Sequence, residues 1–227
     1  MQYEIKGTTM PVVECVLSAG ETLQCQSGAM KYMDADVDMK TGVQGGIGGF
    51  VKRKMMGEKG FLNFYTASRN GSRVALGHTY PGKIVPIEVG SVDYICQRRA
   101  FLGGQATVDL DIAIQKRLGA GFFGGEGFIM QRLTGSGTAF LEIDGEVIEM
   151  TLMGGESIKV ETGALAFMEA TVNLDVQMVK GVSNFLFGGE GLFLTTLTGP
   201  GKVWLQTMSI QSLAGEIYPY LPIKKSS

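Results

Sequence analysis

The sequence predicts an all-β protein built from three copies of one β-unit. Glycine contributes 34 of the 227 residues, roughly double its usual share of ~7%. So much glycine without a collagen-like period indicates many tight turns between short strands. Runs in which apolar and polar residues alternate recur along the chain, and blocks of sequence repeat at constant offsets. These observations favour strands over helices.

The repeat is clearest between the middle and the last part of the chain. A shift of 64 residues superimposes three separate blocks of similar sequence, which chance composition does not produce. The matched blocks are residues 106–111 with 170–175, 123–127 with 187–191, and 133–137 with 197–201.

A third copy lies at the start of the chain. A shift of 135 residues places residues 12–14, 20–23, 27–30 and 33–35 on 147–149, 155–158, 162–165 and 168–170. The copies run roughly over residues 1–80, 81–144 and 145–215, followed by a short tail. No Pro/Ser-rich or charge-rich linker separates them. We therefore expect one domain over residues 1–227, in which three β-layers share one core.

Each copy contains recognisable strands. Short β-branched runs occupy residues 12–17, 84–89 and 147–152, and period-2 alternation follows Val37, Val108 and Val172. One helical turn is expected near residues 209–214. Because Ala29, Ala100 and Ala164 align between the copies, we expect them at matching positions. We also expect Gly28 and Gly163 to share a backbone geometry.

Composition excludes several classes of protein. The 20 basic and 22 acidic residues lack the basic excess of a nucleic-acid binder, so nucleic acid is not an expected partner. The three cysteines lack the spacing of a zinc site or a disulfide framework, and we expect free thiols. The chain opens without an apolar leader, and no window matches the ~18 apolar residues of a membrane span. A soluble, cytoplasmic protein is the expectation.

The residue types needed for catalysis are scarce. His78 is the single histidine, too few for a histidine-rich metal centre, and no nucleophile motif surrounds it. The aspartates at 34, 36, 38, 109 and 111 alternate along strands, as solvated edge charges do. The glycine-rich residues 45–49 lack the Gly-Lys-Ser/Thr of a phosphate loop. We expect no catalytic residue, metal or cofactor.

Three hairpin tips carry large apolar residues among glycines, where turns are normally polar. These tips either fold back onto the core or form an exposed patch for a partner. The first tip, residues 48–57, also carries basic residues that suit another subunit or an anionic membrane surface. The predicted interaction surface comprises Phe50, Lys52, Arg53, Lys54, Met55, Met56, Phe122, Phe123, Phe185 and Phe187.

Glu58, Glu126 and Glu190 occupy equivalent positions in the three copies. If the copies were arranged around a pseudo-threefold axis, these carboxylates would converge and require a cation or raised pKa values. The alternative is three solvated turn residues.

Several of these motifs resemble the altered-inheritance-of-mitochondria (mitochondrial biogenesis) protein family. The resemblance rests on residues 27–30 and 162–165, the two Phe-Gly-Gly-Glu-Gly hairpins, and residues 197–201 with 203–206. It implies a β-sandwich related to short double-stranded β-helices, like the trp RNA-binding attenuation protein, and it implies self-assembly. It implies no catalytic activity, and the likeness to an RNA binder is one of fold alone.

The sequence therefore predicts a non-enzymatic, self-assembling β-protein that acts as an interaction or scaffold module. A homo-oligomer is expected, with a protein partner or a membrane surface as further possibilities. Two alternatives stay open: a ring that binds a small ligand or RNA, and a protein that meets membranes through residues 48–57.

Overall fold

The computed structural model describes residues 1–42, 62–77, 79–116, 128–178 and 193–221. They form antiparallel strands almost throughout, which confirms the all-β class. The first copy contains β1 (Gln2–Lys6), β2 (Val12–Leu17), β3 (Thr22–Gln26), β4 (Met30–Met33), β5 (Val37–Gly42), β6 (Leu62–Ala67) and β7 (Ser72–Gly77). The second contains β8 (Gly82–Val89), β9 (Tyr94–Gln97), β10 (Phe101–Gln105), β11 (Val108–Lys116), β12 (Phe128–Gly135) and β13 (Gly137–Asp144).

The third copy is followed by a short helical arm. Its strands are β14 (Val147–Leu152), β15 (Ser157–Glu161), β16 (Leu165–Glu169), β17 (Asn173–Met178), β18 (Phe193–Thr198) and β19 (Gly201–Gln206). The 3₁₀ turn η2 (Thr162–Ala164) precedes β16, and the arm consists of α2 (Ile210–Ile217) and η3 (Tyr218–Tyr220). Ser209 caps α2 by accepting a hydrogen bond from the Ser212 amide. The expected helical turn is thus present and extends beyond residue 214.

The strands form four sheets, with the same order in every copy. Sheet I is β1-β2-β7-β4, sheet II is β5-β6-β3-β10-β13-β8, sheet III is β11-β12-β9-β16-β19-β14 and sheet IV is β15-β18-β17. Counted from β2 in the first copy, where β1 is an additional strand, the first, sixth and third strands of each copy lie in one sheet, and the fourth, fifth and second strands lie in the next. Each central sheet is therefore half from one copy and half from the following copy.

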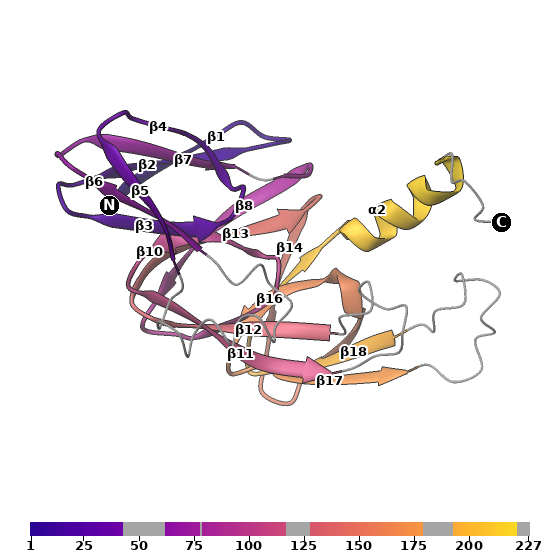
Figure 1. Cartoon of the computed structure of the whole chain (residues 1–227). Helices are drawn as coiled ribbons and strands as arrows, with labels where there is room; N and C mark the ends of the chain where they lie inside the picture. Colours follow the sequence, from indigo (N-terminus) through magenta and orange to yellow (C-terminus); the bar gives the residue numbers. More distant parts are fainter. Residues whose placement is uncertain (43–61, 78, 117–127, 179–192, 222–227) are drawn as a thin grey trace.

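The core is divided among the layers. One cluster, with Val13, Leu76 and Phe140, lies between sheets I and II. A second, with Phe101 and Leu141, lies between sheets II and III, and a third, with Leu165 and Leu197, lies between sheets III and IV. The expectation of one shared core is corrected to three successive clusters, because the central sheets II and III each bury apolar side chains on both faces. Figure 1 shows sheet I at one end of the molecule and β17 and β18 at the other.

The third strand of every copy carries the same irregularity. The register with the sixth strand shifts between Met30 and Tyr32 in β4, between Phe101 and Gly103 in β10, and between Leu165 and Phe167 in β16. Tyr32, Gly103 and Phe167 face Ala75, Phe140 and Trp204, so these positions are structurally equivalent. The shared bulge is a structural signature of the repeat.

One expected equivalence is wrong. Gly28 adopts a φ of +90°, whereas Gly163 lies in η2 and does not have a positive φ. The carbonyl oxygen of Gly163 accepts hydrogen bonds from the side-chain amides of Gln206 and Gln97. These contacts accompany a backbone turn in the third copy that differs from that of the first.

Consecutive copies join where the second strand of one pairs with the third strand of the next. The two repeat junctions are β3 with β10 and β9 with β16, and both are antiparallel. Their registers superpose residue by residue: Leu23, Gln24 and Cys25 pair with Gln105, Gly104 and Gly103, and Tyr94, Ile95 and Cys96 pair with Glu169, Met168 and Phe167.

Gln24 gives the first repeat junction a buried polar contact. Its side chain is fully buried, and its amide nitrogen donates to the carbonyl oxygens of Gln105, at 3.1 Å, and Val108. We expect Gln24→Ala to lower the free energy of unfolding by about 2 kcal/mol or more, because it opens a cavity and removes a buried donor from two carbonyls. Chemical denaturation measures the change. Lys159→Ala, at the equivalent but exposed position of the third copy, is the matched control; equal losses in the two variants would contradict this reading.

Candidate functional site

All the residues of the predicted interaction surface and of the predicted carboxylate trio lie outside the described residues. This applies to Phe50, Lys52, Arg53, Lys54, Met55, Met56, Phe122, Phe123, Phe185 and Phe187, and to Glu58, Glu126 and Glu190. His78 also falls in a gap of the described chain. The hairpin-tip hypothesis therefore stays a prediction, and a candidate site must be sought on the described strands.

The paired aspartates of the first copy serve as local anchors. Asp34 binds Arg73 through two side-chain hydrogen bonds of 2.9 and 3.2 Å. Asp36 accepts a hydrogen bond from the Ser72 hydroxyl and forms an ion pair with Arg69 at 3.1 Å. These bonds hold the pKa of each carboxyl below its usual range. Within the described ranges, no group of three metal-binding side chains occurs. No helix in those ranges is long and apolar enough to cross a bilayer.

Both repeat junctions contain a similar side-chain contact between consecutive copies. The Gln26 amide nitrogen donates to the carbonyl oxygen of Arg98, and that of Gln97 donates to the carbonyl oxygen of Gly163, each at 3.3 Å. In both cases the glutamine ends the second strand of one copy, and its acceptor lies in the turn before the third strand of the next. This contact, together with the strand ladder, ties each turn to the preceding copy.

Among the described strands, each end of the repeat array presents one half of the repeat junction without its neighbour. In the first copy the third strand, β4, is the last strand of sheet I, and in the third copy the second strand, β15, is the last strand of sheet IV. Tyr32 on β4 is 41% exposed, whereas its equivalent Phe167 is 0% exposed. β15 is largely exposed, whereas the middle of β3 is buried. We call β4 and β15 the free edges.

Backbone hydrogen bonds identify which peptide groups the free edges present to solvent. The Gly199 amide donates to the Glu156 carbonyl, so the peptide N–H and C=O groups of the even-numbered residues of β15 point toward β18. Residues 157, 159 and 161 therefore point their amides and carbonyls away from the sheet. Next to β4, the Asp34 amide donates to the carbonyl of Arg73 in β7. By the alternation of antiparallel pairs, the peptide groups of Met33 therefore point away from β7. An unpaired row of this kind is a template for another strand.

The face of sheet I beside β4 is polar. Glu14 is buried, and its carboxylate accepts one hydrogen bond from the Lys6 ammonium at 2.7 Å and another from the Tyr32 hydroxyl. These two bonds, the one from Lys6 first, hold the pKa of the Glu14 carboxyl below its ordinary value. Tyr32 is thus held flat against the sheet, next to the free edge.

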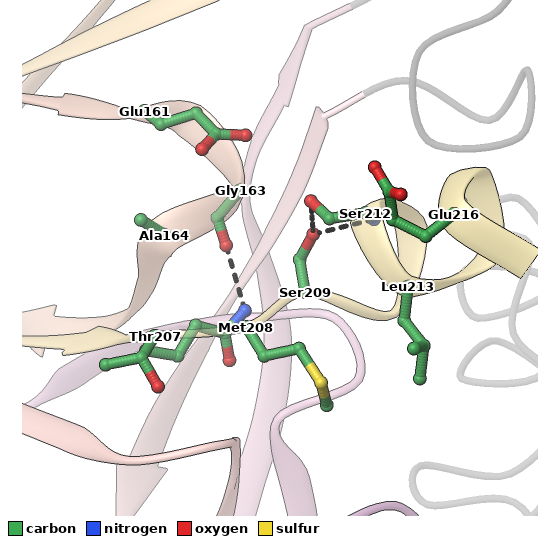
Figure 2. A pocket seen from close by; sticks show the side chains of 10 residues that line it. Glu161, Gly163, Ala164, Thr207, Met208, Ser209, Ser212, Leu213 and Glu216 are labelled. Carbon is green, nitrogen blue, oxygen red and sulfur yellow. Dashed lines mark hydrogen bonds between the residues drawn. The ribbon is translucent and has the colours of Figure 1, made fainter.

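A pocket of about 280 Å³ lies beside the end of β15. Figure 2 shows Glu161, Gly163 and Ala164 on one side, Thr207 and Met208 below, and Ser209, Ser212, Leu213 and Glu216 of the α2 region opposite. The Ser209 hydroxyl is engaged by the Ser212 amide at 3.1 Å and the Ser212 hydroxyl at 2.8 Å. Its bonds are those of a helix cap, and no general base contacts it among the described residues that line the pocket.

The C-terminal arm exposes a second apolar surface. Ile217, Tyr218, Tyr220 and Leu221 are between 46% and 86% exposed, and Figure 1 shows α2 projecting from the body of the molecule. Contiguous exposed apolar side chains indicate a surface that meets a partner. The described chain thus offers two candidate contact surfaces, the free edges and this arm.

Comparison with known proteins agrees with the fold. A family model described as mitochondrial biogenesis AIM24 matches residues 3–208. The chain belongs to this family. A relative from Streptococcus pyogenes serotype M6, the uncharacterized protein M6_Spy0233, is 27% identical over 232 residues, covering 98% of this chain and 92% of that protein. The crystal structure of protein SPYM3_0169 from Streptococcus pyogenes superposes with a TM-score of 0.79 at 24% identity, covering 97% and 99% of the two chains.

The family assignment and the crystal structure support the β-fold and assign no activity. Sequence reasoning missed the free edges, although a signal was present. Once the three copies are aligned, Lys31 and Tyr32 of the first copy stand where the third has Ala166 and Phe167. A change from apolar to polar at one end of a repeat array marks a terminal unit.

Glu142 on β13 provides a titratable group at the position that Gln206 occupies in the third copy. Burial, with a smaller contribution from Asp144, raises the pKa of its carboxyl from 4.5 to about 8, although Lys31 and Arg99 oppose the shift. The protonated form is favoured in the fold. The resulting stability is complete below pH 4.5 and is lost as the pH rises through 8.

We expect Glu142→Gln to raise the free energy of unfolding relative to the native chain at pH 8–9, by on the order of 2 kcal/mol, and to have little effect near pH 4. Glutamine suits the site, because Gln206 fills the equivalent position. Thermal and urea unfolding across this pH range measures the difference. A gap between the two proteins that is independent of pH would contradict the raised pKa.

Proposed function

We propose that this chain is a non-enzymatic interaction module that assembles with copies of itself. The observation that carries the proposal is the pair of free edges. The described fold joins its copies twice through one kind of strand pairing, and it ends with one unpaired half of that pairing on each side. An exposed strand edge favours addition of another strand.

The exposed arm supports the same proposal. Tyr218 and Tyr220 are 63% and 86% exposed, and tyrosine is enriched where proteins bind other proteins. The hairpin tips predicted from sequence remain a further candidate surface for assembly. The alternatives of an RNA- or ligand-binding ring and of membrane contact through residues 48–57 gain no specific support from the described residues.

Self-association predicts masses that are multiples of 24.3 kDa. Light scattering after size-exclusion chromatography, repeated over a dilution series, should show an oligomer that dissociates as the protein is diluted. A Phe122→Ser/Phe123→Ser variant then tests the hairpin tips and a Tyr218→Ser/Tyr220→Ser variant tests the arm, with circular dichroism as the check on folding. A mass of 24.3 kDa at every concentration would exclude the proposed function.

A further inference from the structure

We propose that copies of this chain join end to end, with β15 of one copy pairing antiparallel with β4 of the next, in the geometry of the two repeat junctions. This inference rests on the proposed function and specifies its surface and its register. The partner of the free edge is therefore a second copy of this chain. The free edges are the unpaired counterparts of the strands that form the two repeat junctions within the chain.

The repeat dictates the register of the proposed pairing. Ile158, Lys159 and Val160 are the counterparts of Leu23, Gln24 and Cys25 on β3. Tyr32, Met33 and Asp34 are the counterparts of Gly103, Gly104 and Gln105 on β10. Transferring the register of β3 with β10 pairs Tyr32 with Val160, Met33 with Lys159 and Asp34 with Ile158.

The backbone groups on the two edges match this register. In the first repeat junction the Ala106 amide donates to the Thr22 carbonyl at 3.1 Å, and in the second the Ala170 amide donates to the Asp93 carbonyl at 2.9 Å. By the alternation of antiparallel pairs, Gly104 with Gln24 and Met168 with Ile95 are then the hydrogen-bonded pairs. The equivalent pair is Met33 with Lys159, the residues whose peptide groups point outward on β4 and β15.

Side-chain exposure changes in the direction that pairing requires. Tyr32, at 41% exposure, stands at the position of Phe167, which is fully buried in the second repeat junction. Val160 is 9% exposed and stands at the position of Cys25 and Cys96, both fully buried. Pairing β15 with β4 would cover Tyr32 and complete the burial of Val160, which is the state of their equivalents inside the chain.

The two ends carry complementary charges. Glu161 on β15 replaces the glutamines 26 and 97, and the exposed Lys31 on β4 replaces Leu102 and Ala166. Continuing the register by one residue brings Glu161 of one copy alongside Lys31 of the next. The repeat junctions have a neutral residue at each of these positions, so the opposite charges distinguish the ends from the interior. Complementary charges of this kind select a partner and fix its register.

The proposed contact is head-to-tail, because the two edges belong to different copies of the repeat. Sheet I and sheet IV lie at opposite ends of the described molecule (Figure 1), and β4 and β15 do not pair within the chain. A heterologous contact of this kind generates a closed ring or an open filament. It would extend sheet IV of one copy into sheet I of the next, giving the strand order β17-β18-β15-β4-β7-β2-β1.

Lys159→Pro tests the backbone pairing. The Lys159 amide points away from β18, so proline removes the outward donor while the ladder with β18 keeps its hydrogen bonds, a position where edge strands tolerate proline. We expect Lys159→Pro to weaken self-association by about tenfold or more, and Lys159→Ala, which keeps the amide, to associate like the native chain. Analytical ultracentrifugation gives the dissociation constants, and circular dichroism verifies the fold. Native-like association of a folded Lys159→Pro variant would overturn the pairing.

Exchange of the two charges tests the register without altering the backbone. Lys31→Glu and Glu161→Lys should each weaken association at low salt, and the double variant Lys31→Glu/Glu161→Lys should restore it. An equimolar mixture of the two single variants should assemble with alternating chains, because opposite charges meet at both contacts between unlike chains and equal charges meet between like chains. If the native chain assembles and neither single variant is weaker, the pairing fails while the proposed function stands. If the native chain is monomeric, both fail.

Discussion

The fold depends on one interaction, the antiparallel pairing of the second strand of each copy with the third strand of the next. No copy has a complete pair of six-stranded layers of its own, because each central sheet takes half of its strands from a neighbour. A small isolated sheet is at best marginally stable in water, and each repeat junction joins two three-stranded halves into one six-stranded sheet. The core clusters follow, because sheets II and III then bury apolar residues on both faces.

The ends of the array differ from the repeat junctions in charge. Lysine on an exposed edge strand discourages indiscriminate strand addition, and the free edges carry Lys31 and Lys159. Both edges also have peptide groups that point away from their own sheets. In addition, β4 has the half-buried Met33, and β15 has the acidic Glu161. Under the proposed pairing, such a surface discourages random aggregation and favours a strand whose charges and register match. Specific recognition built on repulsion of the wrong partner is a general device.

Several features of the fold were predictable from the sequence for physical reasons. Period-2 alternation located β11 after Val108, because the buried Val108 and the exposed Asp109 point to opposite faces of the sheet, and the offset blocks found the repeat because equivalent turns need equivalent residues. The shared sheets were not predictable, since pairing between copies depends on contacts distant in sequence. The expected geometry of Gly163 failed because that residue lies in a 3₁₀ turn and receives two glutamine amides, an interaction that local sequence does not reveal. The predicted hairpin-tip residues lie outside the described chain, so they remain untested.

Cross-linking tests the central claim most directly. Chains carrying Tyr32→Cys are mixed with chains carrying Val160→Cys, oxidised and mapped by mass spectrometry. The pair corresponds to a non-hydrogen-bonded position, where Cα atoms lie ~4.5 Å apart, within the span of a disulfide. Cysteine fits at residue 160, since Cys25 and Cys96 occupy the equivalent sites. The native Cys15 and Cys25 thiols should compete little for oxidation, because burial raises their pKa to about 12. Pairing of β15 with β4 in this register predicts a 32–160 disulfide between chains and little disulfide when Ile158→Cys replaces Val160→Cys. Equal yields from both mixtures, or none from either, would contradict the pairing.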